Sequence, residues 1–194
     1  AKKRDFSIYL PGLTIPMLPH VLSNGVCSLN PNEDRYTMSV KMEIRNGGET
    51  RMVSIDKAII NSDYRLTYDG VSELFETGDN ADYNDELKEF LFIAREVYDI
   101  LKSQSEMRGT ISFMSSEAKF IMDDMNRIVD ILSRPQREAE ELIEEMMIAT
   151  NRVVSKKYRE MELPFIYRIH EEPTDEKLEG MRTLLRPFGV KVPE

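Results

Sequence analysis

Hydrophobic and polar residues alternate without interruption between residues 36 and 44, which predicts a β-strand with one face toward solvent. The apolar members of the alternation lie on one side: Tyr36, Met38, Val40, Met42 and Ile44. The sequence Asn46-Gly47-Gly48 then turns the chain, because glycine reaches positive φ angles without a steric penalty. A second strand over residues 50–60 completes a β-hairpin.

Further along the chain, apolar residues recur at three- and four-residue steps, the period of an amphipathic helix. A short helix is expected over residues 69–76, before Gly78, and a long one over residues 82–107, before Gly109. The apolar positions of that long helix are Leu87, Phe90, Leu91, Ala94, Val97, Tyr98 and Leu101. Residues 137–158 predict another long helix, whose apolar arc is Leu142, Ile143, Met146, Met147, Thr150, Val153 and Val154.

The remaining segments predict a second hairpin, one more strand and a last helix. The hairpin joins residues 118–122 and 127–132, and the paired acids Asp123 and Asp124 at its tip favour a turn over a metal site. A strand is expected over residues 165–169 and a helix over residues 175–188, while the first 35 residues are expected to be irregular. The fold class is therefore α+β, with a mixed sheet and hairpins packed against long amphipathic helices.

Composition argues against a nucleic-acid partner. The chain of 194 residues carries 35 acidic and 26 basic side chains, a net charge of −9, whereas RNA-binding surfaces are usually basic. The sequence shows no apolar run of the roughly 20 residues that a membrane helix needs, so no membrane partner is expected. The single cysteine, Cys27, excludes an internal disulfide and fits a cytoplasmic location.

Familiar catalytic motifs are nearly absent from the sequence. The two histidines, His20 and His170, have no nucleophile at a known motif spacing, and there is no Gly-rich phosphate loop or zinc pair. We therefore expect this chain to contain no catalytic residue and to bind no metal. From pattern alone Tyr68 and Phe113 are packing residues, and Glu144 and Glu145 are equivalent glutamates at the two edges of an apolar arc.

Several short sequence blocks, in a fixed order along the chain, nevertheless resemble those of a known protein family. Residues 16–31 read PMLPHVLSNGVCSLNP, and YLP at residues 9–11 precedes them. YRLTY follows at residues 64–68, GTISF at 109–113, LIEEMMIA at 142–149 and YRIH at 167–170. Together these blocks resemble the ribonuclease II / ribonuclease R (RNB-domain) family of processive 3′→5′ exoribonucleases, and they are closer to ribonuclease R.

The resemblance implies that residues 1–194 are the central portion of an RNB exoribonuclease catalytic domain. In that family the metal-binding aspartates lie upstream of these blocks and an arginine-containing motif lies downstream, so both are expected outside this chain. The parent would degrade single-stranded RNA to nucleoside 5′-monophosphates with Mg²⁺, and the fragment alone would be inactive. Strand edges that pair with absent segments would also allow non-physiological self-association.

The family further implies RNA-binding roles for four residues. Tyr68 would pack against the 3′-terminal nucleotide and set the length of the final product, and Phe113 would stack on the other side of the terminal bases. Glu144 would contact the leaving nucleotide, and Tyr9 would hold the RNA farther from the cut. Aromatic faces suit a sequence-blind enzyme, because stacking contributes ~1–3 kcal/mol per base whatever the base.

An alternative function from a different class is an acidic, non-enzymatic α+β module that docks a protein partner through its two long helices. This alternative accounts for the net charge and for the missing catalytic residues. It does not account for residues 16–31.

Overall fold

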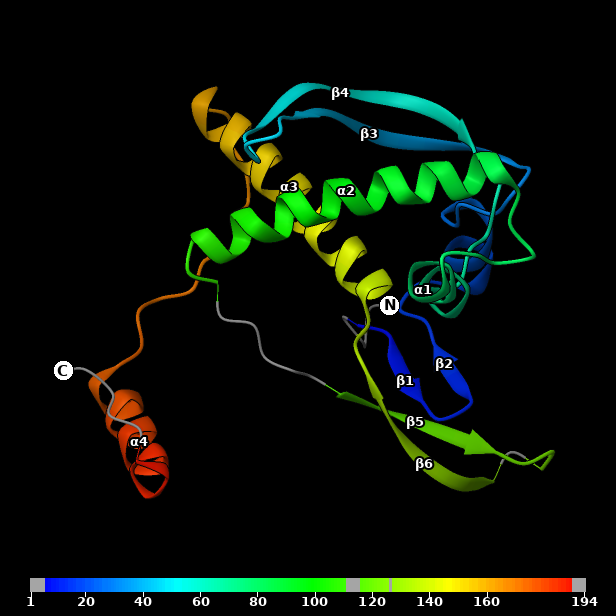
Figure 1. Ribbon diagram of the computed structural model, residues 1–194. Helices are drawn as coiled ribbons and strands as arrows, with labels where there is room; N and C mark the ends of the chain where they lie inside the picture. Colours follow the sequence, from blue (N-terminus) through cyan, green and yellow to red (C-terminus); the bar gives the residue numbers. More distant parts are fainter. Residues whose placement is uncertain (1–5, 111–115, 126, 190–194) are drawn as a thin grey trace.

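Three helices pack around one small core, and three β-hairpins surround it (Figure 1). The computed structural model describes residues 6–110, 116–125 and 127–189. In chain order the strands are β1 (Ile8–Leu10), β2 (Leu13–Ile15), β3 (Asp34–Ile44), β4 (Thr50–Asn61), β5 (Ser116–Met122) and β6 (Ile128–Pro135). The helices are the π-helical η1 (Val21–Val26), α1 (Tyr68–Thr77), α2 (Asp85–Met107), α3 (Glu138–Glu160), α4 (Asp175–Leu185) and the 3₁₀ turn η2 (Arg186–Phe188).

The predicted α+β class is confirmed, but the predicted mixed sheet is wrong for the strands that the structure describes. These strands form three separate two-stranded antiparallel sheets, β1–β2, β3–β4 and β5–β6, and one isolated parallel bridge joins Pro31 to Ser62. Each sheet pairs strands that are neighbours in the sequence. Tight turns produce this arrangement, because they return the chain antiparallel, whereas parallel pairing needs a long crossover.

The β3–β4 hairpin has the predicted extent, but the apolar face of its first strand is shielded from solvent only in part. Val40, Met42 and Ile44 are half-buried, whereas Tyr36 and Met38 on the same face are 90% and 63% exposed. The hairpin contacts α3, yet no described element covers Tyr36 and Met38. Alternation therefore predicted the strand correctly, but tertiary contacts decide which part of its apolar face is buried.

Three other segments differ from the expectations. The first 35 residues contain the β1–β2 hairpin and η1, and residues 165–169 pair with no other described segment as a strand. Helix α2 begins at Asp85, later than predicted, because the side chain of Asn84 caps it by accepting a hydrogen bond from the Leu87 amide at 2.8 Å. Helix α4 begins as predicted, with Thr174 as its cap.

The core lies where α1, α2 and α3 meet. Leu74 of α1 is completely buried at its centre. The other buried members of the cluster are Val71, Phe75, Leu87, Leu91, Tyr98, Ala139 and Leu142. Phe90, which the helical period placed on the apolar side of α2, is instead 64% exposed. Among the residues described, no helix combines the length and apolarity that a membrane crossing requires.

Charged side chains tie the three helices together at the edge of this core. Arg95 of α2 donates two hydrogen bonds to the carboxylate of Glu138 on α3, at 2.5 and 2.8 Å, and its guanidinium lies 5.0 Å from the ring centre of Phe75 on α1. A planar guanidinium can make both contacts at once, because its edge binds the carboxylate while its face covers the ring. Arg95 thus contacts all three helices.

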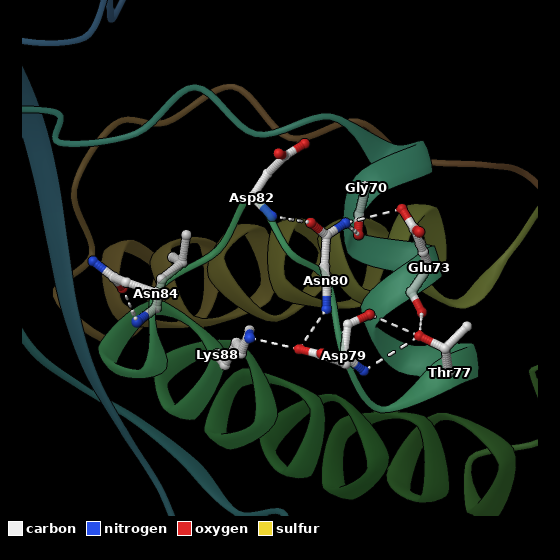
Figure 2. A network of polar contacts seen from close by, with 9 residues as sticks. Gly70, Glu73, Thr77, Asp79, Asn80, Asp82, Asn84 and Lys88 are labelled. Atoms are coloured by element: carbon white, nitrogen blue, oxygen red, sulfur yellow. Dashed lines mark hydrogen bonds and ion pairs between the residues drawn. The ribbon is translucent and has the colours of Figure 1, made fainter.

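The connection between α1 and α2 is organised around one buried amide (Figure 2). The Asn80 side chain donates to the Gly70 carbonyl at 3.2 Å and to the Glu73 carboxylate at 3.0 Å, and it accepts from the Asp82 amide at 2.9 Å. Figure 2 also shows Lys88 of α2 paired with Asp79. These bonds satisfy the polar atoms of a buried side chain and fix the first turns of α1 relative to α2.

The turn of the β3–β4 hairpin rests on α2 through glycine. Gln104 donates to the Gly47 carbonyl at 2.7 Å, and a Cβ atom added to Gly48 would lie 1.9 Å from Cγ of Gln104. Gly48 also has a φ of +77°, which other L-residues adopt only with strain. This position therefore requires glycine both for its backbone angle and for its contact with α2.

We expect Gly48→Ala to lower the free energy of unfolding by about 1–2 kcal/mol, because it adds backbone strain and a steric overlap. Gly47→Ala is the matched control, since a Cβ atom there meets nothing within 4 Å. Gln104→Ala removes the overlap together with the Gln104–Gly47 hydrogen bond. Adding Gly48→Ala to Gln104→Ala should therefore cost less than Gly48→Ala in the wild type, because only the strain remains to be added. Urea unfolding of the wild type, the three single variants and the double variant measures both terms, and equal losses at the two glycines would contradict this account.

Candidate nucleic-acid interface

Tyr68 is the first residue of α1, and its neighbours anchor it to α3. The Thr67 hydroxyl caps the helix by accepting from the Gly70 amide at 3.2 Å, and the Tyr68 side chain remains 44% exposed. The adjacent Asp69 carboxylate accepts hydrogen bonds from Arg134, at 3.0 Å, and from Arg137. The ring of Tyr68 therefore sits on a helix end that is held by two cations just before α3.

Glu144 lies on the exposed side of α3. Gln136 donates to its Oε2 atom at 2.7 Å. The next residue, Glu145, is half-buried and lines a cleft elsewhere on the helix, so the structure separates two glutamates that periodicity left equivalent. Ile143 and Met147, predicted on the apolar arc of α3, are instead 42% and 59% exposed. Glu144 is therefore flanked along the helix by accessible apolar side chains.

Two of the four predicted RNA-binding residues are brought to one region. Residues 134–137 connect them, because the arginines at both ends bind Asp69 beside Tyr68, and Gln136 between them binds Glu144. Phe113 lies outside the described residues. Tyr9 is 78% exposed on β1. The turn of that hairpin, at Gly12, lies against the Met122 side chain of β5, and Figure 1 accordingly shows β1–β2 beside β5–β6.

A second feature was missed by the sequence reasoning: a cleft of about 720 Å³ between α2, α3, the β3–β4 turn and residues 167–169. Its floor includes the buried residues Leu101, Ala149 and Val153. The basic side chains around it are Arg108, Arg152, Lys156, Arg159 and Arg168, against two acidic ones, Glu49 and Glu145. A protein with a net charge of −9 thus concentrates positive charge at one cleft.

Among the described residues, the arginines of this cleft are not ion-paired. Lys156 has only a long contact of 3.9 Å with Glu160. Burial lowers the pKa of Arg108, the positive charge of Arg152 lowers it further, and Glu145 partly opposes the shift. One signal was available in the sequence, since residues 152, 156 and 159 are spaced so that they share one face of α3.

Metal-binding geometry is not found in the part of the chain that the structure describes. No three His, Cys, Asp or Glu side chains come together there in a way that could hold an ion. The predicted turn role of Asp123 is confirmed, because its carboxylate accepts from the amides of Met125 and Arg127 at 2.9 Å each. Those bonds, the Arg127 amide first, lower the pKa of Asp123.

Comparison with known proteins gives a match along nearly the whole chain. The RNB domain family matches residues 1–192. Ribonuclease R of Thermotoga maritima is 38% identical over 192 residues, which is 98% of this chain and 27% of that protein. Ribonuclease R of Escherichia coli is 37% identical over 194 residues, which is 100% of this chain and 24% of that protein. The chain therefore spans about a quarter of the length of these curated relatives.

Solved structures agree with the sequence comparison. RNase R of Mycoplasma genitalium in complex with double-stranded RNA superposes with a TM-score of 0.88 and 28% identity, covering 97% of this chain and 34% of that one. The same enzyme in complex with ribose-methylated single-stranded RNA gives a TM-score of 0.87 at 28% identity, covering 97% and 30%. The hairpins and helices described above are thus arranged as in the corresponding part of those proteins.

Proposed function

Because this chain belongs to the RNB domain family, we propose that it is the central part of a ribonuclease R-like exoribonuclease. The parent protein would act in the cytoplasm and degrade single-stranded RNA from its 3′ end to nucleoside 5′-monophosphates. Tyr9, Tyr68, Phe113 and Glu144 would contact the RNA. The observation that carries the proposal is that Tyr68 and Glu144 are both exposed, while residues 134–137 bind both Asp69, next to Tyr68, and Glu144.

The chemistry of these two side chains suits the end of an RNA strand. The exposed ring of Tyr68 offers a stacking face to any base, and Ile143 and Met147 add apolar surface next to Glu144. Gln136 binds one oxygen of the Glu144 carboxylate, and the carboxylate has further acceptor capacity for ribose hydroxyl groups. Such a site suits a single strand, since its bases are readily unstacked and can then be covered by an aromatic ring.

We propose that hydrolysis requires Mg²⁺ held by residues outside this chain. When bound, such an ion would activate the attacking water. Residues 6–110, 116–125 and 127–189 offer no cluster of carboxylates for it, so their part is to bind and orient the RNA. The chain alone is therefore expected to leave labelled RNA uncut when Mg²⁺ is added, and a ladder of shortened products would contradict this assignment.

The contact with the terminal nucleotide can be tested directly on this chain. RNA carrying 4-thiouridine at its 3′ end is expected to cross-link under ultraviolet light to Tyr68 or to its neighbours on α1 and α3. Tyr68→Ala should reduce the yield roughly tenfold, the effect of losing one stacked base. Tyr36→Ala is the control, because that ring is 90% exposed on a different element. Cross-links located by mass spectrometry mainly on other elements would overturn the proposal.

A further inference from the structure

The cleft between α2, α3 and the β3–β4 turn carries features of a nucleic-acid site that the residues beside Tyr68 do not explain. We infer that it binds the phosphate backbone of single-stranded RNA upstream of the 3′-terminal nucleotide. The inference rests on the proposed function, which supplies the strand whose end lies near Tyr68. The cleft would be a second binding site for that strand, formed by different residues on a different face of α3.

Positive charge is concentrated at the cleft. Arg152, Lys156 and Arg159 project from consecutive turns of α3, and Arg108 and Arg168 reach the cleft from other segments. Arginines that support the fold, such as Arg95 and Arg134, are each paired with carboxylates. The cleft arginines have no such partner among the described residues. Guanidinium groups that line one cleft without a carboxylate partner can form charge-assisted hydrogen bonds with phosphate oxygens, which makes phosphate binding favourable.

The acids of the cleft do not cancel this charge. Glu49 is paired with Arg45 at 3.2 Å, so its charge is already compensated on the hairpin. Burial is the main reason that the pKa of Arg108 is lowered, but of the two charges that act on it Arg152 lowers the pKa by more than Glu145 raises it. An anion entering the cleft would therefore meet a positive local field.

The cleft also presents an accessible aromatic ring. Tyr167 lines the cleft and is 42% exposed. Its ring meets the edge of Phe165 at a centroid distance of 5.3 Å, and Phe165 packs against Tyr158 of α3 at 4.7 Å. This row of three rings fixes the orientation of Tyr167. A positively charged groove combined with an aromatic platform is typical of single-strand binding, whereas an acidic peptide would need only the charges.

The cleft and the terminal-nucleotide region lie along the same helix, α3. Glu144 and Arg159 lie on the same helix, fifteen residues apart, which corresponds to about 22 Å along the axis. Helix α3 could therefore guide one strand from the terminal-nucleotide region to the cleft. The β3–β4 turn forms one wall of that cleft through residues 48–50, so the contact between Gly48 and Gln104 also shapes the site.

A charge-matched pair of variants tests the inference on this chain. Fluorescence anisotropy across a salt series would measure the binding of labelled single-stranded RNA. The RNA would have roughly a dozen nucleotides, a length within the range of known single-strand sites. Arg152→Gln/Arg159→Gln is expected to weaken binding roughly tenfold and to reduce the salt slope by about 0.7 for each phosphate group that the variant no longer neutralises. Lys41→Gln/Lys57→Gln removes the same charge from exposed positions of β3–β4 and should change neither quantity appreciably. Circular dichroism would verify that both proteins fold.

A second comparison separates RNA from a general polyanion. Tyr167→Ala should weaken RNA binding, Tyr167→Phe should retain it, and neither should affect binding of a polyglutamate peptide. Equal competition by polyglutamate, with no effect of Tyr167→Ala on RNA, would overturn the assignment in favour of an acidic protein segment.

The outcomes also distinguish this inference from the proposed function. Cross-linking of the 3′ end at Tyr68 with no effect of the arginine variants would overturn the cleft alone. Loss of binding in the arginine variants without a cross-link near Tyr68 would overturn the Tyr68 assignment and support the cleft. A wild-type chain that binds no single-stranded RNA would overturn both.

Discussion

Replacing Leu74 with alanine is expected to lower the free energy of unfolding by about 3 kcal/mol, because apolar burial is removed and a cavity is left behind. Leu74 is completely buried at the point where α1 meets α2 and α3. Chains of this size are typically stable by only about 5–15 kcal/mol, so the loss is a large fraction of the total. Since α1 also begins at Tyr68, loosening this helix should weaken cross-linking at the terminal nucleotide as well.

The control makes the same chemical change on another helix. Leu184 of α4 is 70% exposed, so Leu184→Ala should change stability by no more than about 0.5 kcal/mol. Urea unfolding followed by far-ultraviolet circular dichroism measures both variants. Similar losses at the two positions would show that the three-helix core does not dominate the stability of the chain.

Replacing Glu141 with glutamine is expected to lower the free energy of unfolding by about 2 kcal/mol, because the protein loses a charged acceptor of two hydrogen bonds. The Tyr98 hydroxyl donates to Glu141 at 2.5 Å, and Lys102 donates to Glu141 at 2.6 Å and to Tyr98 at 2.7 Å. Tyr98 is only 3% exposed, so its hydroxyl cannot turn to water instead. Glu160→Gln, on the exposed end of α3, is the control.

This network also predicts how stability depends on pH. The hydrogen bond from Lys102, followed by that from Tyr98, lowers the pKa of Glu141. Its contribution is therefore fully present above the ordinary glutamate pKa and is lost as pH falls through the lower folded pKa. Burial, with the Glu141 hydrogen bond, raises the pKa of Tyr98 to about 12, so the contribution of its neutral hydroxyl disappears as pH rises from about 10 toward that value.

Denaturant unfolding of the wild-type and Glu141→Gln proteins across the acid range measures the first of these effects. The stability difference between the two proteins should shrink as pH falls, because the wild-type carboxylate becomes protonated. A difference that stayed constant down to strongly acidic pH would mean that the charge of Glu141 does not stabilise the fold.

Long elements with a clear period and local caps could be predicted from the sequence. Thr67 and Thr174 cap helices close to their predicted starts, and the turns around Gly48 and Asp123 define their hairpins. The Asn84 cap was not anticipated, so α2 begins at Asp85 and not at the predicted residue 82. The β1–β2 hairpin was missed because strands of three residues are too short to show a period. The strand expected at residues 165–169 is absent because an apolar run does not supply a neighbouring strand to pair with.

The candidate site was predictable only in part. The resemblance identified Tyr68 and Glu144, and the structure connects them through contacts of residues 134–137, which no periodicity indicates. The cleft is assembled from four segments that are distant in sequence, so net composition concealed it. The total charge argued against RNA because it sums over the whole chain and so hides a local basic cleft.

That uneven distribution of charge has a kinetic consequence. The net charge of −9 repels a polyanion at a distance from the cleft, whereas a polyanion near Arg152 and Arg159 is attracted, so encounters are steered to one side of the protein. At physiological salt both forces fade within about 8 Å, which restricts the steering to the last moments of approach. Low ionic strength would lengthen that range and raise the association rate. High salt would screen the charges, so that the polyanion would no longer be oriented before contact.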